Sequence, residues 1–349
     1  MAEAGRVVVG LDGTEQADAA AEWAADEAVL RGTGVRLVHV LEPSPDVLVP
    51  FVSREPDTSW GEELLARTAA RLRASRPGLS VTTRLLPSDP VTSLVLATEE
   101  DGDLLVLGSR ALGGVAGYLL GSVGLTVAGR IERPVVLVRA PGSPPGREGR
   151  AGDGRGPEGH AVGGRRPEGR AGEGRGAEGR AGEGRGPEGH AGMDGTGDDR
   201  AGARTAPGTG PVVVGVDPRD PMDGVVAFAF AEAASRGGEV RVVHARRPSL
   251  HDRLSSPGAP DARQAVAPEA RRSLDVLLEP WRERFPGVAA TGHVVAGSAG
   301  QELARAAEGA ALLVVGRRTR RSALGAHLGS VAHAVLHHVR APVAVVPHD

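Results

Sequence analysis

The sequence contains no cysteine, which excludes disulfide bonds, thiolate metal ligands and cysteine nucleophiles. This absence is compatible with a reducing compartment. Aromatic residues are also scarce, with four Phe, three Trp and one Tyr in 349 residues. A core must therefore be built from Val, Leu and Ala, and few side chains are left for stacking on nucleobases.

Neither charge nor hydropathy points to a nucleic acid or a membrane. The formal net charge is −3, so the chain as a whole does not attract a phosphate backbone. The first residues, MAEAGRVVVGLD, contain no basic stretch followed by an apolar one, and no run of about 18 apolar residues occurs anywhere. We expect a soluble, cytoplasmic protein that binds neither nucleic acid nor membrane.

The composition divides the chain into three segments. Residues 141–210 consist mostly of Gly, Arg, Glu and Pro and repeat a ten-residue unit, for example RAGEGRGPEG at 180–189. Such a segment buries too little apolar surface to offset its chain entropy, so we expect a disordered linker. A collagen helix is excluded because glycine does not recur at every third position. The flanking segments, 1–140 and 211–349, each have the length of a domain.

The two flanking segments repeat each other. GRVVVGLD at 5–12 matches GPVVVGVD at 210–217, and the match continues without a gap to residues 44 and 249. Farther on, LLVLGSRALGGVAGYLLGSV matches LLVVGRRTRRSALGAHLGSV. The chain is therefore a tandem duplication of one domain. The first match pairs Asp12 with Asp217, Arg31 with Arg236 and His39 with His244.

Each copy alternates short apolar runs with helical patterns, which predicts a mostly parallel sheet built from βαβ units. Runs such as VVVG and LLVLG have no period of two, so helices should cover both faces. We predict two three-layer α/β/α sandwiches, each with a five-stranded sheet. The predicted strands are 6–11, 35–41, 80–86, 103–108 and 134–139 in the first copy and 211–216, 240–245, 288–295, 311–316 and 342–347 in the second. The predicted helices of the first copy are 14–31, 58–75, 90–101 and 121–132.

The stretch GSRALGGVAGYLLGSVG at 108–124 is the strongest candidate for a binding site. It begins at the carboxyl end of a predicted parallel strand, where ligands bind in open sheets. It ends at Gly121 and Ser122, where a helix begins and offers unpaired N–H groups to a phosphate. Asp12 ends the first strand at the same edge and could contact a sugar or a base. The alternative is structural: Gly121 and Ser122 only start a helix, and the other glycines only loosen a surface loop.

The strand order, the VGLDGT end of the first strand and the glycine loop resemble the universal stress proteins, in their tandem actinobacterial form. The resemblance covers both flanking segments and not the linker. It implies an adenine nucleotide alpha hydrolase-like fold that binds ATP, with or without Mg²⁺. Two positions of the first copy depart from the family pattern, because Ala111 replaces a glycine and Gly124 replaces a frequent serine. The implied binding residues of this copy are Asp12, Val40, Gly108, Gly121, Ser122 and Val123.

The second copy departs further from the pattern. Thr319 replaces the second glycine and His333 the later serine, and a β-branched residue is poorly suited to a positive φ. The arginines of this loop could grip phosphates, or they could form a solvated basic loop; they are Arg317, Arg318, Arg320 and Arg321. The resemblance implies the binding residues Asp217, Gly316, Gly329, Ser330 and Val331. We expect ATP to bind mainly to the first copy, with the second partly degenerate.

The remaining histidines and tryptophans receive structural interpretations. His333 and His337 have the spacing of a metal chelate, but no acidic residue completes an HExxH pattern, and histidines near a helix C-terminus also interact favourably with the helix dipole. We therefore predict no metal site. Four further residues are predicted to be packed or hydrogen-bonded rather than catalytic or adenine-binding: His39, His244, Trp60 and Trp281.

The resemblance also implies that the last strands of the copies, PVVLVRA and PVAVVPHD, pair antiparallel within one chain. No residue pattern supports catalysis, and GSVG is not the GxSxG turn of a serine nucleophile. We expect a non-enzymatic regulatory protein of the stress response that binds an adenine nucleotide and acts on an unidentified protein partner. Two alternatives remain. The chain could be an interaction module without a nucleotide, or a weak ATPase or self-phosphorylating enzyme that depends on Ser122.

Overall fold

The computed structural model describes seven stretches of the chain, and everything below refers to these. They are residues 6–41, 58–109, 121–140, 210–220, 222–246, 268–319 and 328–349. The predicted linker lies outside the described residues, apart from Gly210. The inner part of each glycine loop, with Ala111, Arg320 and Arg321, also lies outside them.

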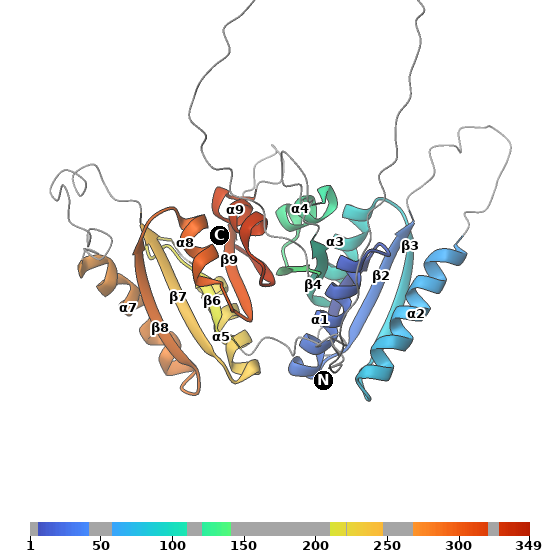
Figure 1. Cartoon of the computed structure of the whole chain (residues 1–349), viewed down its shortest axis with the longest axis horizontal. Helices are drawn as coiled ribbons and strands as arrows, with labels where there is room; N and C mark the ends of the chain where they lie inside the picture. The colour runs from blue at the N-terminus through green and yellow to red at the C-terminus, as the bar shows by residue number, and fades with distance from the viewer. Residues whose placement is uncertain are drawn as a thin grey trace, which may run out of the picture. The chain divides into compact units, whose positions relative to one another are not determined.

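Strands and helices alternate along both copies, as predicted (Figure 1). Domain 1 contains β1 (Arg6–Leu11), α1 (Glu15–Arg31), β2 (Val35–Leu41), α2 (Ser59–Ser75), β3 (Val81–Pro87), α3 (Pro90–Asp101), β4 (Gly102–Ser109), α4 (Ser122–Arg130) and β5 (Val135–Arg139). Domain 2 contains β6 (Val212–Gly215), α5 (Asp223–Arg236), β7 (Glu239–Arg246), α7 (Pro268–Arg284), β8 (Ala289–Ala296), α8 (Ala299–Ala306), β9 (Leu312–Arg318), α9 (Ser330–His338) and β10 (Val343–His348). The observed strands lie within about two residues of the predicted ones, which is the usual uncertainty of an element's end.

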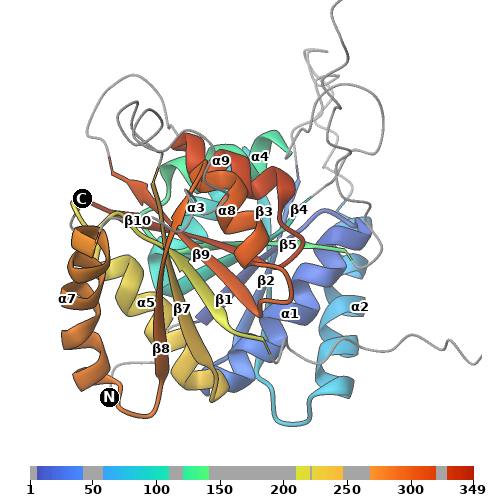
Figure 2. The same ribbon diagram turned by 60° about the vertical axis from the view of Figure 1, so that its left-hand side comes forward.

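The strands of both domains form one sheet in the order β3-β2-β1-β4-β5-β10-β9-β6-β7-β8. Neighbouring strands are parallel within each domain. The domains meet where β5 pairs antiparallel with β10, with Ala344 opposite Val136 (Figure 2). The predicted pairing of the last strands is therefore confirmed. It removes two exposed strand edges that would otherwise be free to pair with another chain.

Helices cover both faces of the sheet, and alternate residues of each strand enter two separate cores. On β1, Val7 and Val9 pack toward α1 and α2, whereas Val8 packs toward α3 and α4. All three are almost fully buried. This two-sided burial explains why the strands have no polar alternation, as expected of parallel sheets with helices on both sides.

Helix α1 positions the edge of domain 1 that carries the candidate site. It begins after Thr14, whose side chain accepts a hydrogen bond from the Ala17 N–H at 3.3 Å. It ends at Gly32, which has a left-handed φ of 65°. The buried face consists mainly of alanines, at positions 17, 20, 21, 24, 25 and 28. These small side chains favour the helix and let it lie close to the sheet.

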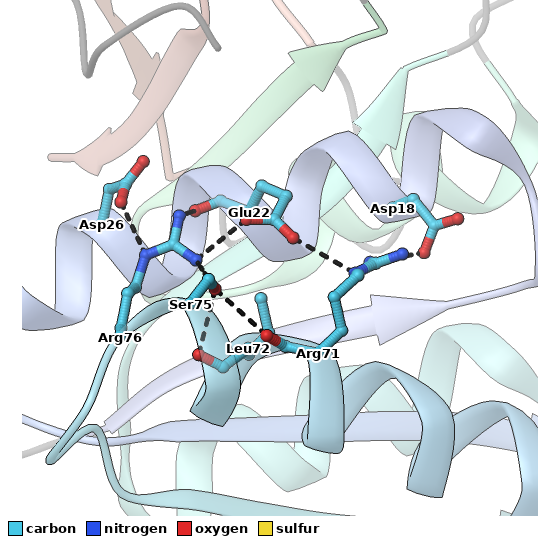
Figure 3. A network of polar contacts seen from close by, with 7 residues as sticks. All are labelled: Asp18, Glu22, Asp26, Arg71, Leu72, Ser75 and Arg76. Atoms are coloured by element: carbon cyan, nitrogen blue, oxygen red, sulfur yellow. Dashed lines mark hydrogen bonds and ion pairs between the residues drawn. The ribbon is translucent and has the colours of Figure 1, made fainter. Parts of the chain in front are cut away.

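Ion pairs join α1 to α2 in domain 1 (Figure 3). Arg71 lies 2.7 Å from Asp18 and 3.1 Å from Glu22. Arg76 lies 2.8 Å from Glu22 and 2.7 Å from Asp26. Between the corresponding helices of domain 2, an aromatic cluster stands instead, formed by Phe230, Trp281 and Phe285. The two copies have thus diverged in how they fix this helix pair.

Candidate functional site

The strand order reverses between β1 and β4, because β2 and β3 lie on one side of β1 while β4 and β5 lie on the other. Ligands of open parallel sheets bind at such a switch point, beyond the carboxyl ends of the strands. Asp12 follows β1 directly, and Gly108 lies at the end of β4. The structure therefore brings these two predicted site residues to the expected edge.

Asp12 is exposed and its carboxylate has a fixed orientation. Its Oδ1 accepts hydrogen bonds from the Thr14 N–H at 3.1 Å and from the Thr14 hydroxyl at 2.6 Å. The same hydroxyl oxygen accepts the bond from Ala17 that starts α1. The turn thus ties the carboxylate to the first turn of the helix.

Gly108 has a clear role in the fold. A Cβ at this position would lie 2.6 Å from the Gln16 carbonyl carbon and 2.7 Å from the Ala17 nitrogen. Only glycine lets the first turn of α1 approach the end of β4 so closely. Val40, near the end of β2, is half-buried and packs against the core under α3 and α4.

Gly121 and Ser122 form the start of α4 and are both exposed. Gly121 has a φ of −49°, and no described atom lies within 4 Å of where its Cβ would be. Gly121, the cap residue, has no side chain to accept a hydrogen bond, so among the described residues the first-turn N–H groups are left to an anion. Val123, the next residue, is half-buried in the core on the same side.

The matching edge of domain 2 is partly filled by its own side chains. Asp217 is exposed and accepts a hydrogen bond from the Arg219 N–H at 3.1 Å. A Cβ on Gly316 would lie 2.7 Å from the Met222 methyl and 2.8 Å from the His348 ring. Helix α5 begins only after Met222, so side chains occupy the space that the first turn of α1 fills in domain 1.

The start of α9 closely resembles that of α4. Gly329 has a φ of −59° with no described atom within 4 Å of a Cβ, and Ser330 is exposed. Val331 is half-buried. Thr319, which replaces a motif glycine, donates from its N–H and its hydroxyl to the His348 carbonyl at 2.7 and 3.1 Å. These bonds tie the beginning of this loop to the end of β10.

Arg317 lies in neither of the environments expected for the arginines of this loop. It is only 6% exposed, because β9 continues to Arg318 and the strand alternation turns Arg317 inward. Its guanidinium donates to the carbonyls of Gly129, at 3.0 Å, and Ile131, both in domain 1. Arg318 is exposed and donates to Asp220 at 2.8 Å. The structure therefore separates the two arginines by role.

His39 and His244 are hydrogen-bonded, as predicted. His39 Nδ1 lies 2.8 Å from the Leu11 carbonyl oxygen, and His244 Nδ1 lies 3.0 Å from that of Val216. His333 and His337 approach each other to 3.3 Å between their Nε2 atoms. Across the described part of the chain, no group of three or more His, Cys, Asp or Glu is arranged to hold a metal ion.

Trp281 packs as predicted, but Trp60 does not. Trp281 is 9% exposed, whereas Trp60 is 54% exposed. The Trp60 ring lies against Gly13, the residue after Asp12, and meets His39 edge-on with centroids 5.1 Å apart. Sequence reasoning missed this position, since a Trp at the start of a helix resembles an ordinary packing residue. The structure places it beside the candidate site.

Comparison with known sequences gives a family. The model of the Universal stress protein family matches residues 3–139 and 209–347. The chain is 30% identical over 346 residues to universal stress protein Rv2005c of Mycobacterium tuberculosis, covering 97% of this chain and 96% of the relative. It is 27% identical over 349 residues to universal stress protein Rv2623 of the same organism, covering 97% and 95%.

Comparison with a solved structure of matching length agrees with the fold. A universal stress protein from Archaeoglobus fulgidus has a TM-score of 0.60 at 16% identity, covering 99% of this chain and 100% of that one. A universal stress protein of Archaeoglobus fulgidus in complex with dAMP matches one domain's length, with 26% identity, 38% of this chain and 96% of that one covered, and a TM-score of 0.31. Among the described helices, none combines the length and apolar character needed to cross a membrane.

Proposed function

Because the chain belongs to the universal stress protein family, with two copies in tandem, we propose that it is a regulatory protein of the stress response that binds ATP. Binding takes place mainly in domain 1, and domain 2 is partly degenerate. Nucleotide binding alters the surface that an unidentified protein partner recognises. The protein is not an enzyme in this proposal.

One observation supports this function most directly: none of the described residues requires a glycine at the start of α4. Gly121 has a negative φ, and no described atom lies within 4 Å of its Cβ position, so Ser, Thr or Asp would fit among these residues and would cap the helix better. A glycine there leaves the first-turn N–H groups accessible to phosphate oxygens. Ser122 adds a hydroxyl donor to the same turn.

Asp12 suits the sugar end of the same ligand. Its Oδ1 is already engaged by Thr14, and a carboxylate has further acceptor capacity for ribose hydroxyls. The carboxylate and the α4 N-terminus flank the switch point between β1 and β4. An acceptor for the sugar and donors for the phosphates therefore stand at one sheet edge, and ATP supplies the matching groups.

The contrast with domain 2 supports unequal sites. Met222 and His348 occupy the space over Gly316, and Thr319 is held by the end of β10. A nucleotide would therefore meet different groups at this edge than in domain 1, where backbone atoms of Gln16 and Ala17 lie over Gly108. The helix starts at Gly121 and Gly329 are equally open among the described residues, so the proposed inequality depends on the groups over Gly316 and at Thr319.

Calorimetric titration of ATP and Mg²⁺ into the full chain tests the proposal. We expect binding that is lost in Gly121→Val and retained in the matched variant Gly329→Val, since the valine blocks only one helix start in each case. Absence of binding to the wild-type chain would favour the alternative, an interaction module without a nucleotide. Equal loss in both variants would contradict the assignment to domain 1.

The non-enzymatic character has its own measurement. Phosphate release from ATP and incorporation of labelled phosphate into the protein should both remain at background. Turnover or labelling that disappears in Ser122→Ala, with ATP still bound, would instead identify a weak ATPase or a self-phosphorylating enzyme.

A further inference from the structure

Arg317 of domain 2 contacts the helix that opens the candidate site of domain 1. Its guanidinium donates to the carbonyls of Gly129, at 3.0 Å, and Ile131. These carbonyls belong to the last turn and the C-cap of α4, whose first residue is Ser122. The two ends of this short helix therefore face different domains. Its N-terminus lies at the candidate phosphate site of domain 1, and its C-terminus is bound by an arginine of domain 2, next to Gly316.

The reverse contact is made by a different arginine. Arg139 stands at the end of β5, beside Ser109 of β4. Its guanidinium donates to the Leu336 carbonyl at 2.7 Å, in the last turn of α9. Arg139 and Arg317 do not correspond in the duplication, because Arg317 is on the fourth strand of its domain and Arg139 on the fifth. Each domain nevertheless anchors the helix that follows the fourth strand of the other.

The physical case is strongest for Arg317. Helices leave their last carbonyls without internal partners and carry partial negative charge there, so a cation that donates to them is favourable. Arg317 is 6% exposed, and its Nε finds no hydrogen-bond partner in the described part of the chain. Burial lowers the pKa of this guanidinium. Taking a guanidinium out of water costs free energy, and hydrogen bonds to helix carbonyls offset only part of this cost. The burial of Arg317 therefore indicates a positioning role.

Helix α4 is held most firmly at its C-terminal end, where Arg317 binds, whereas Val123 and Leu125 nearer its start are only half-buried. It has only nine residues, starts without a side-chain cap, and buries Val127, Ala128 and Gly129 near its C-terminal end. A nine-residue helix is about 14 Å long. A change of position at Gly129 is therefore carried along a rigid element to Ser122.

We infer that Arg317 is a positioning residue for the nucleotide site of domain 1, so that domain 2 forms part of that site without contacting the ligand. This inference rests on the proposed function. In this arrangement the partly degenerate domain 2 has a structural role, because it holds α4 of domain 1 in place. Arg139 plays the reciprocal part for α9.

The test uses the full chain and a pair of neighbouring arginines. Both variants are made in a Gly329→Val background, so that binding is measured at domain 1 alone. Here Arg317→Ala should weaken the binding of ATP with Mg²⁺ by on the order of fivefold or more, which is the lower end of typical coupling between two sites. Arg318→Ala removes the same charge one residue away, but its side chain pairs with Asp220 and not with α4. It should bind as its parent does. Equal affinities of the two variants would overturn the inference.

A ligand-free measurement keeps the inference separate from the proposed function. Amide hydrogen exchange of the peptide 121–131 should be faster in Arg317→Ala than in Arg318→Ala, and that of 329–339 should be faster in Arg139→Ala. If the wild-type chain binds no ATP, the proposed function fails while this comparison still decides whether Arg317 positions α4. If Arg317→Ala does not fold, Arg317→Lys, which keeps the charge but loses the planar fork, replaces it in both measurements. Unchanged exchange of 121–131 would overturn the inference.

Discussion

Arg31 of domain 1 and Glu232 of domain 2 form an ion pair across the two domains, and Arg236 forms the mirror pair with Glu27. Each arginine also binds the glutamate four residues before it on its own helix. The two glutamates are almost completely buried, at 1% and 2% exposure. The rings are duplicated too, since Arg31 lies over Phe228 and Arg236 over Trp23, with 5.7 and 5.9 Å to the ring centroids. The duplication has thus kept a self-complementary contact, as in a two-fold dimer.

This buried cluster should be essential for stability. Burial, together with the nearby Glu27 carboxylate, raises the pKa of Glu232 against the opposing effect of the two arginines. Glu232→Ala leaves the guanidinium groups without one of their two carboxylate acceptors and should lower the free energy of unfolding by about 3–5 kcal/mol. Urea-induced unfolding measures this loss.

The surface pair of Arg84 and Glu100 provides the control. Its side chains are 40% and 55% exposed, so Glu100→Ala should cost less than about 1 kcal/mol. If both alanine variants unfold at the same urea concentration, the buried cluster contributes no more than a surface pair.

Two glycines of the candidate site should respond oppositely to substitution. Gly108→Ala forces a Cβ to within 2.6 Å of the Gln16 carbonyl carbon and should destabilise the protein by about 1–3 kcal/mol. Gly121→Ser adds a better helix cap in open space and should leave stability unchanged or raised by a few tenths of a kcal/mol. It should nevertheless weaken ATP binding. Thermal unfolding beside calorimetry separates these effects, and a Gly121→Ser protein that is less stable than wild type would contradict the account.

The fold could be predicted from the sequence because its signals are local. VVVG and LLVLG indicate buried parallel strands. Thr14 and Gly32, which cap the start and the end of α1, directly adjoin that helix in the sequence. The antiparallel pairing of the last strands was instead predicted from the resemblance to the universal stress proteins. The same local logic placed Asp12, Gly121 and Ser122 at one sheet edge.

The side-chain contacts between the domains could not be predicted from local patterns. Arg317 stands in the run RRTRR, which is typical of an exposed basic loop, and its acceptors are more than 180 residues away. Glu27 lies in an alanine-rich helix where a charged residue normally faces solvent, and its partner Arg236 is 209 residues away. Only the pairing of whole domains brings these groups together, so no pattern along the chain predicts these contacts.

The pH dependence of stability should reveal His337. Burial, with His333, His338 and Arg139 nearby, lowers the pKa of His337 to about 4, against roughly 6.5 in an unfolded chain. Between these values the unfolded chain binds a proton that the native protein does not, so the free energy of unfolding falls as the pH drops from about 6.5 to about 4. Above that window the contribution is constant.

Replacement of the imidazole removes this part of the slope. The decline over the same window should be smaller in His337→Gln than in wild type, as measured by urea unfolding at several pH values. Parallel curves for wild type and His337→Gln would show that the native state accepts the proton without cost.

Trp60 should report on the candidate site through its fluorescence. It is 54% exposed, whereas Trp281 is 9% exposed and Trp23 is half-buried at the contact between the domains. Most of the emission that acrylamide can quench should therefore disappear in Trp60→Phe and persist in Trp23→Phe. Because the Trp60 ring lies against Gly13, directly after Asp12, ATP bound at this edge should shield it and reduce the quenching constant. The reduction should be absent in Gly121→Val, where the phosphates have no place. Shielding that persists in Gly121→Val would mean that the nucleotide binds away from the start of α4.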